Sequence, residues 1–285
     1  SGFTMSGVNS SLTATGGSGD FAHGLSVNGG NFTISNGEIV AHGGSNKADG
    51  ILINSGNLNQ SGGKITATGG LTLLTSGIRV NRAYNQTGGE LYAHGGTAQD
   101  AKGVAVVNNF TQNQGAVYAW GGTALYAYGI HVYGTLTQER GEINAEGGDL
   151  AEGIRAGSII QNNGEINATG KGTGSNNYAH GINVSNFTQN NGTINAYGSD
   201  VSLSRGINIG NLLTQNGGVI NATGGSYGNT TATLALYSRG FVQNAGTVNG
   251  LGGSGVNARG FYAGTITQYA GTINGTGGSG ANAYG

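Results

Sequence analysis

A phrase of about 26 residues recurs along this chain, and it limits the available folds more than any other feature. The phrase reads GIRVNRAYNQTGGELYAHGG from Gly77, GVAVVNNFTQNQGAVYAWGG from Gly103 and GFYAGTITQYAGTINGTGG from Gly260. A repeat of this length indicates an elongated fold in which each unit packs only on its neighbours. We therefore expect one solenoid domain over residues 1–285, with a partial coil over 1–23 and ten coils that begin near residues 24, 50, 77, 103, 129, 153, 181, 206, 235 and 260.

Each unit contains three short segments whose apolar and polar residues alternate. In the first segment Ile78 and Val80 share one face and Arg79 takes the other; in the third, Ile166 and Asn167 take opposite faces. This alternation predicts strands, and no segment has the spacing of three and four that a helix needs. The fold class is therefore all-β, a parallel β-solenoid with three strands in each coil. Parallel crossovers are right-handed by default, so we expect a right-handed β-helix.

Glycine and proline have opposite extremes of abundance, and the solenoid accounts for both. The chain has 61 glycines and no proline. Proline would remove a backbone donor from the ladder between coils. Paired glycines end the third segment, and we expect them to have positive φ at a corner. These pairs are Gly69-Gly70, Gly95-Gly96, Gly121-Gly122, Gly224-Gly225 and Gly277-Gly278.

Glutamine occupies one position in nine of the ten full coils, three residues before a glycine. The remaining coil has Ile34 there, which indicates that the side chain faces inward. Stacked amides can hydrogen-bond from coil to coil, so we predict an internal ladder; an exposed, ligand-binding array is the alternative. The ladder would contain Gln60, Gln86, Gln112, Gln138, Gln161, Gln189, Gln215, Gln243 and Gln268. A second, outward ladder is expected for Asn144, Asn167, Asn195, Asn221, Asn249 and Asn274.

Charge and cysteine content exclude several classes of function. The net charge is -1, only 8% of the residues are charged, and there is no cysteine. Without a basic stripe we expect no nucleic-acid partner, and without a long apolar stretch no membrane insertion of this segment. Disulfides and zinc–thiolate sites are excluded. We expect no cofactor and no metal site, with the five histidines, His23, His42, His94, His131 and His180, lying singly at the surface.

Aromatic side chains gather on the outer face of the third segments. Exposed aromatic rings can bind sugars or mark protein contacts, whereas an aromatic ladder that only stabilises the sheet is the alternative. The candidates for glycan or protein contact are Tyr92, His94, Tyr118, Trp120 and Tyr197.

Two further functions are alternatives to a structural role. Glu142 and Glu165 fall on adjacent coils, with Arg140, Glu146 and Asp149 nearby, as a polysaccharide-cleaving enzyme would require. Nothing in the sequence indicates a groove there, so we predict no catalytic residues and no enzyme. A row of threonines on the third segments suggests an ice-binding face, but Tyr92 and Trp120 interrupt this row on later coils. The threonines are Thr13, Thr15, Thr66 and Thr68.

The phrases FTQNNGTINA and LTQNGGVINATGG resemble the passenger regions of bacterial autotransporters and filamentous-haemagglutinin-like adhesins. There is a weaker resemblance to curli-type fibre subunits, whose repeat is shorter. The resemblance implies a right-handed β-helix at the cell surface or outside the cell, and it supplies no catalytic residues.

The first 23 residues form part of a coil, and Gly285 begins another. We therefore expect continuation in a longer chain or end-to-end self-association. The predicted function is a structural extracellular repeat protein: a rigid rod, stalk or filament for surface display, adhesion or matrix assembly. A glycan-binding module that recognises surface glycans is the alternative.

Overall fold

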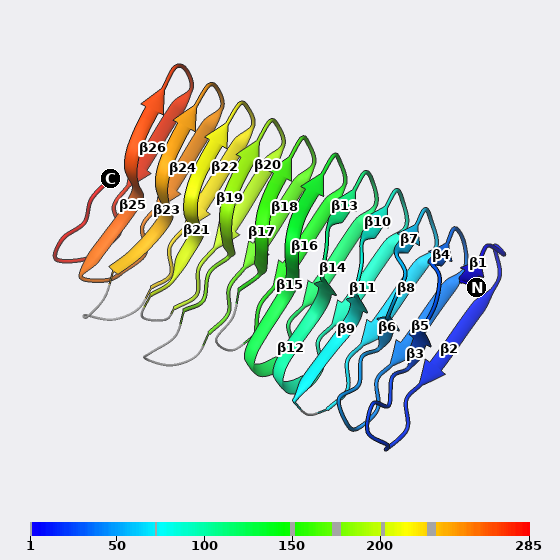
Figure 1. Ribbon diagram of the computed structural model, residues 1–285. Coiled ribbons are helices and arrows are strands. Elements are labelled where there is room, and N and C mark those ends of the chain that lie inside the picture. Colours follow the sequence, from blue (N-terminus) through cyan, green and yellow to red (C-terminus); the bar gives the residue numbers. More distant parts are fainter. Residues whose placement is uncertain (1, 72, 149–151, 173–177, 201–202, 227–231) are drawn as a thin grey trace.

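The computed structural model describes residues 2–71, 73–148, 152–172, 178–200, 203–226 and 232–285. Every regular element in these residues is a β-strand, and none is a helix. All strand pairs are parallel, and the coils stack into a rod with the two termini at opposite ends (Figure 1). The prediction of an all-β parallel solenoid with a spacing of about 26 residues is confirmed.

The third segments of the coils form one continuous 11-stranded sheet. Equivalent residues pair in register along its length, as Ile143 does with Ile166 and Asn144 with Asn167. Its strands are β2 (Ser11–Thr15), β5 (Glu38–His42), β8 (Lys64–Thr68), β11 (Glu90–His94), β14 (Ala116–Trp120), β16 (Glu142–Glu146), β18 (Glu165–Thr169), β20 (Thr193–Tyr197), β22 (Val219–Thr223), β24 (Thr247–Leu251) and β26 (Thr272–Thr276).

The first and second segments form a 15-stranded sheet on the other side of the rod. Separate first segments are β3 (Leu25–Val27), β6 (Ile51–Ile53), β9 (Leu74–Val80) and β12 (Thr97–Val106). Separate second segments are β1 (Phe3–Met5), β4 (Phe32–Ile34), β7 (Leu58–Gln60), β10 (Tyr84–Gln86) and β13 (Phe110–Gln112). The two segments are joined in β15 (Thr123–Gln138), β17 (Ile154–Gln161), β19 (Ile182–Gln189), β21 (Arg205–Gln215), β23 (Ala232–Gln243) and β25 (Asn257–Gln268).

The predicted number of three strands in each coil is thus correct for the N-terminal coils. It is wrong for the coils from β15 onward, which have two strands each. The connector between the first two segments explains the change. It covers residues 28–31 between β3 and β4 but only 157–158 within β17. A shorter connector leaves no room for a separate turn, and the bend becomes an irregularity in a continuous strand, such as the register shift between Val132 and Thr135.

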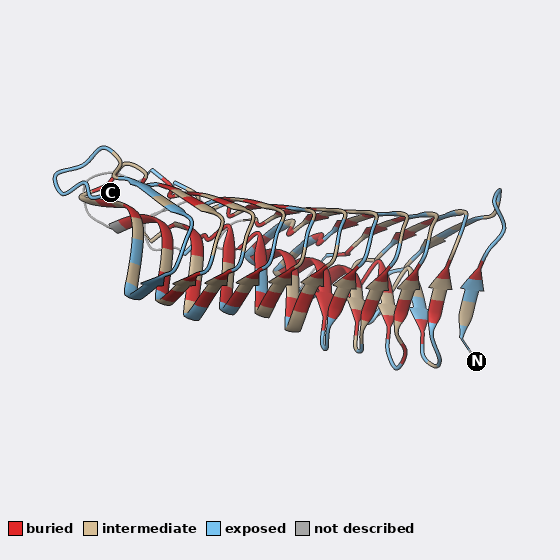
Figure 2. Ribbon diagram, turned by 90° about the horizontal axis from the view of Figure 1, so that it is seen from above, coloured by how far each residue is buried: buried red, intermediate tan, exposed pale blue. Residues whose placement is uncertain are grey.

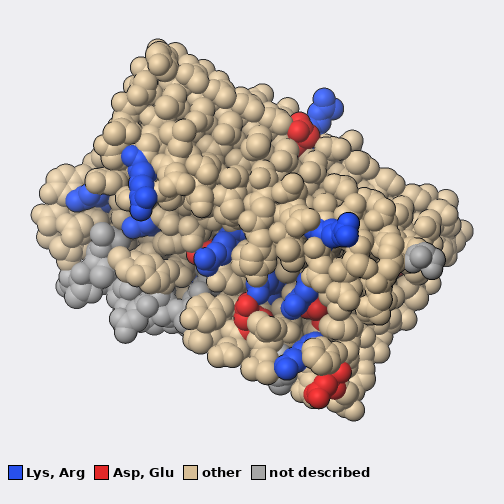
Figure 3. Space-filling model, in the orientation of Figure 1, with Lys and Arg blue, Asp and Glu red and all other residues tan. Residues whose placement is uncertain are grey.

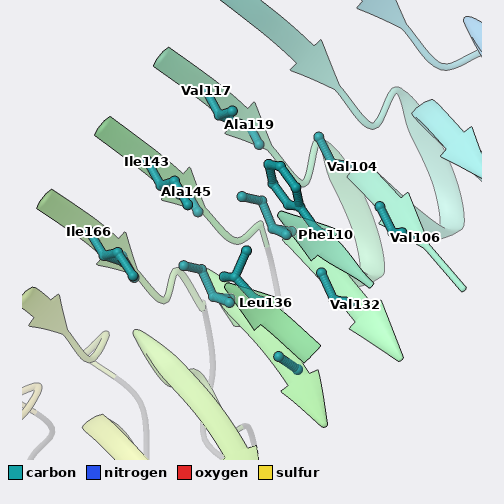
Figure 4. Packing of buried hydrophobic residues seen from close by; sticks show 14 of the residues in the cluster. Val104, Val106, Phe110, Val117, Ala119, Val132, Leu136, Ile143, Ala145 and Ile166 are labelled. Carbon is teal, nitrogen blue, oxygen red and sulfur yellow. The ribbon is translucent and has the colours of Figure 1, made fainter. Parts of the chain in front are cut away.

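The core lies between the two sheets as one apolar cluster that extends from Met5 to Val248. Buried residues follow the rod along its length (Figure 2). In Figure 4, Val117 and Ile143 of one sheet point toward Phe110 and Leu136 of the other. Each coil buries its apolar residues against identical positions of its neighbours, which stabilises the stack without disulfides.

Glycines are required at two corners for two different reasons, and the expectation for the paired glycines is mostly wrong. Positive φ occurs instead at the glycine three residues after each glutamine position, where φ lies between 68 and 100° from Gly37 to Gly271. Among the five predicted pairs only Gly96 and Gly122 have positive φ. The other paired glycines allow neighbouring coils to approach closely; a Cβ at Gly70, for example, would overlap the backbone oxygen of Gly44.

Candidate functional site

The nine glutamines form a continuous hydrogen-bonded column at one edge of the core. From Gln86 to Gln268, each Nε2 donates to Oε1 of the glutamine one coil nearer the N-terminus, at distances from 2.8 to 3.5 Å. The side chains from Gln60 to Gln243 are buried, and only Gln268 in the last coil is exposed. Ile34 pairs in register with Gln60 and is fully buried, so the inward orientation continues past the end of the ladder.

The glutamine column also links the two sheets. Nε2 of Gln112 lies 3.2 Å from the backbone oxygen of Gly115 in the adjoining turn. The same atom lies 3.0 Å from the backbone oxygen of Glu142, which belongs to β16 of the opposite sheet. The N–H groups of each buried amide therefore find acceptors, and the backbone carbonyl groups beside the amide find a donor.

Asparagines form two further ladders on the surface. Residues Asn144 to Asn274 of the expected outer column are joined by Nδ2–Oδ1 hydrogen bonds of 2.8–3.0 Å. A second column, at the turn after the glutamines, was not predicted from the sequence; its hydrogen bonds are 2.6–2.7 Å long. The recurring Gln-Asn dipeptide is the signal that could have revealed it. This column consists of Asn162, Asn190, Asn216 and Asn244.

Four of the five predicted contact residues lie together, and Tyr197 does not. The rings of Tyr92 and Tyr118 stack at 4.9 Å with an interplanar angle of 14°, and Trp120 lies 6.5 Å from Tyr118. His94 pairs in register with Trp120, whereas Tyr197 lies three coils farther along the same column. The stacked rings cover one another's faces, which favours an aromatic ladder over a sugar platform.

The candidate catalytic carboxylates lie on the outer face of the 11-stranded sheet. Glu142 and Glu165 pair in register, and each accepts a hydrogen bond from an asparagine: Asn144 at 2.7 Å and Asn195 at 3.1 Å, respectively. Glu146 forms an ion pair with Lys171. Asp149 lies outside the described residues. The two carboxylates therefore belong to the surface hydrogen-bond network.

Threonines do not form an unbroken row at the N-terminal end of this face. Val40 separates Thr13 from Thr66 in the register, and His42 separates Thr15 from Thr68. The hydroxyl lattice of an ice-binding face is therefore interrupted already at β5, two coils before the interruption at Tyr92 that the sequence predicted.

The structure reveals a group of charged and aromatic side chains on the 15-stranded sheet that the sequence analysis missed. They occupy one or both of two positions in a coil, three residues apart: the residue before the one that begins the coil (a glycine, or Ala235), and the residue two after it. Aligning the coils on that glycine would have revealed these positions, but their residue types differ from coil to coil. We call them the basic row, which comprises Asp49, Arg79, Lys102, Tyr128, His131, Glu152, Arg155, His180, Arg205, Tyr237, Arg259, Tyr262 and Tyr284.

Carboxylates pair with cations in the N-terminal part of the basic row. Asp49 is 2% exposed, and its Oδ2 lies 3.2 Å from Nε of Arg79. Burial raises the pKa of Asp49, while Arg79 and His23 oppose that shift. Glu152 is also buried; its Oε2 lies 3.9 Å from Nη1 of Arg155, and burial raises the pKa of this carboxyl too.

The histidines in the basic row are not the lone surface residues expected. Burial, together with Lys102 and Arg155, lowers the pKa of His131 to about 3. The pKa of His180, which is 4% exposed, is also lowered to about 3 by burial and by neighbouring arginines. Both imidazoles are therefore neutral at pH 7.

A hollow opens beside the N-terminal part of the basic row. It has a volume of about 190 Å³ and is lined by both partners of the Lys102–Asp100 ion pair, whose charged atoms are 2.6 Å apart. Most of the charged side chains visible on this face lie in a band across its middle and lower part, and one acidic and one basic side chain lie apart at the upper edge (Figure 3). The remaining lining residues include Leu74, Arg79, Asn81 and Tyr133.

Among the described residues no group of three or more His, Cys, Asp or Glu is placed to hold a metal ion. No helix there has the length and apolar character to cross a membrane. Comparisons with protein-family models, curated proteins and solved structures give no match. The fold and the ladders therefore define the class, a structural β-solenoid repeat protein.

Proposed function

We propose that this chain is a rigid rod of an extracellular or cell-surface protein, used for surface display, adhesion or matrix assembly. The observation that carries the proposal is the unbroken register of the 11-stranded sheet from β2 to β26. Every coil repeats the same pairing, so bending the rod would disturb many hydrogen bonds at once. At ~4.8 Å for each coil, ten coils span roughly 50 Å.

The glutamine and asparagine columns support this mechanical role. They add side-chain hydrogen bonds parallel to the rod axis, on both sheets and at the turn, to those of the backbone. A slip of one residue would turn each buried glutamine to the opposite face of its strand. The columns therefore fix the register, and the proposal gives Glu142 and Glu165 a structural role with no catalysis.

The proposed partner is a further coil, supplied by another copy or by a longer chain. Strand β26 pairs with a neighbouring coil on one side only, and so does β25 beyond the bridge that joins Arg259 to Tyr284. The apolar residue Ile266 of β25 is 52% exposed at this edge. Such edges pair readily with another strand. The resemblance to surface adhesins supports the extracellular location.

Electron microscopy and small-angle X-ray scattering of the purified chain test the rod. We expect rods of roughly 50 Å or filaments with a ~4.8 Å axial repeat. A compact, near-spherical particle would contradict the proposal. Antibody against this chain, applied to intact cells of its source, tests the location: labelling that appears only after the cells are permeabilised would exclude surface display.

A further inference from the structure

We propose that the C-terminal part of the basic row binds an acidic polysaccharide that lies extended along the rod axis. The contacts would come from Arg205 and Arg259, with Tyr237 and Tyr262 beside them. This inference goes beyond the structural role. The proposed function as a rigid rod would stand even if the chain bound no polysaccharide.

The first argument is that the two arginines have no acidic partner. Unlike Arg79 and Arg155, neither Arg205 nor Arg259 forms an ion pair within the described part of the chain. Nε of Arg259 is buried without a hydrogen-bond partner in that part of the chain. Nη1 of Arg205 donates to Oδ1 of Asn208, a neutral acceptor, and burial lowers the pKa of Arg205 while Tyr237 and Tyr178 oppose that shift. A bound anion would supply the missing charge and acceptors.

Tyrosines hold both guanidinium groups in place. Arg205 lies over the ring of Tyr237 at 4.4 Å, and Arg259 lies over Tyr262 at 5.3 Å and Tyr284 at 5.4 Å. The rings of Tyr237 and Tyr262 stack at 5.5 Å with an interplanar angle of 4°. An arginine held on an aromatic ring loses less conformational freedom when it binds a carboxylate or sulfate group.

The spacing of the arginines favours a polymer over a small anion. Arg205 pairs in register with Leu234, and Leu234 pairs with Arg259. The two arginines are therefore two coils apart, roughly 10 Å at ~4.8 Å for each coil. This separation is comparable with the length of a disaccharide in an extended chain, so a charge on every second sugar would meet both arginines.

Tyrosine exposure further favours a carbohydrate over other polyanions. Tyr262 is 40% exposed and Tyr284 is 53% exposed, and such side chains combine an apolar ring with a hydroxyl donor. Nucleic acid needs many phosphate contacts, and an anionic membrane surface needs a cluster of several basic residues. Two unpaired arginines in a polar row fit the lower charge density of an acidic glycan.

Binding of defined oligosaccharides to the full chain tests the proposal. The probes are an oligogalacturonate, a sulfated heparin-derived oligosaccharide and a fully methyl-esterified oligogalacturonate. We expect calorimetry at low ionic strength to show binding of one or both acidic probes and none of the neutral ester. Comparing the two acidic probes distinguishes a carboxylate ligand from a sulfate ligand.

Variants test whether the acidic oligosaccharides bind at the basic row. Arg205→Gln and Arg259→Gln should each weaken binding about tenfold. Arg140→Gln removes the same charge from an exposed turn and should change the affinity by less than about twofold. Circular dichroism checks that each variant folds; if Arg205→Gln does not, Arg205→Lys and Tyr262→Leu replace it, with an expected loss of binding for both.

Three results would overturn the proposal. The first is no binding of either acidic probe, and the second is equal binding of the neutral ester. The third is tighter binding of single-stranded DNA or of anionic vesicles than of both acidic oligosaccharides. An equal loss of affinity in Arg140→Gln would likewise refute the assignment to the basic row. None of these results would affect the measured shape of the rod.

Discussion

Nε2 of Gln138 lies 3.0 Å from Oε1 of Gln112 in the preceding coil and 2.9 Å from the backbone oxygen of Glu165 in the following coil. One side-chain amide therefore joins three successive coils and both sheets. Because the amide is buried, its hydrogen bonds face no competition from water. Interrupting the column in the middle should cost more stability than interrupting it at its end.

The variant Gln138→Ala should lower the free energy of unfolding by about 2–4 kcal/mol, since it removes buried volume and leaves Gln112 Oε1 without its donor. Gln268→Ala is the matched control, because Gln268 is exposed and ends the ladder. We expect it to cost less than about 1 kcal/mol. Denaturant titration of both variants measures the difference, and equal losses would show that the ladder adds nothing to the middle of the rod.

The variant Tyr84→Phe tests a single hydrogen bond within the column. The fully buried hydroxyl of Tyr84 donates to Oε1 of Gln60 at 2.6 Å, and Gln86 Nε2 is more distant from that oxygen, at 3.5 Å. Phe110 occupies the equivalent position one coil later, so the ring without its hydroxyl fits. We expect a loss of about 1 kcal/mol in denaturant titrations, and an unchanged stability would contradict the importance of this hydrogen bond.

The sequence predicted the fold and the ladders because each depends on a position that repeats. Alternating residues such as Ile166 and Asn167 indicated which face lies inside, and the Ile34 exception placed the glutamines there. The reason for each glycine was harder to predict. Positive φ at Gly63 and close backbone approach at Gly70 both select glycine, and only the folded backbone distinguishes the two causes.

The basic row was missed because its position repeats while its residue type does not. Asp49, Lys102 and His180 occupy equivalent places in their coils yet differ in charge. The burial of these side chains also depends on how the neighbouring coils cover them, and the sequence of a single repeat does not contain that information. The first and second segments merge in β17 because the connector between them is short. Whether a short connector gives one continuous strand depends on whether the backbone ladder continues through the bend, which the sequence alone does not show.

The neutral histidines His131 and His180 predict that stability falls in mild acid. The pKa values of His131 and His180 are lowered to about 3 in the folded protein, against 6.5 in the unfolded chain. Between those values the unfolded state binds protons that the folded state does not. Stability should therefore decrease as the pH falls below 6.5, by up to about 1.4 kcal/mol per pH unit for each histidine.

Variants separate this effect from that of the carboxyls. Burial raises the pKa of Asp49 and of Glu152, so their protonation in the folded state acts in the opposite direction. Unfolding measured from pH 7 to pH 5 should show a shallower decline in the double variant His131→Gln/His180→Gln. His42→Gln is the control, because His42 is exposed. An unchanged slope in the double variant would refute the assignment to these histidines.

The variant Trp120→Ala tests the glycan-binding alternative on the opposite sheet. Trp120 stacks with Tyr118, so its removal should lower the free energy of unfolding by about 1 kcal/mol. We expect the glycan-array profile to stay unchanged. A loss of binding to a neutral glycan, with stability preserved, would instead support a lectin site at Tyr92, Tyr118 and Trp120.

Ala235 and Gly250 reverse an arrangement found in the preceding coil, where Gly206 and Ala222 occupy the equivalent positions. The Cβ of Ala235 lies 3.5 Å from the place that a Cβ at position 250 would take, and that added Cβ would overlap the backbone oxygen of Gly260. Gly250→Ala should therefore cost about 1–3 kcal/mol through overpacking. Ala235→Gly should cost about 1 kcal/mol through lost packing and greater freedom of the unfolded chain. The overlap is with the backbone of Gly260, which Ala235→Gly leaves in place, and the 3.5 Å approach to the Cβ of Ala235 is an ordinary van der Waals contact. We therefore expect the double variant to lose about the sum of the two single losses. A double-mutant cycle measures this, and a recovery of about 1 kcal/mol or more relative to the sum would show that the two positions compensate each other.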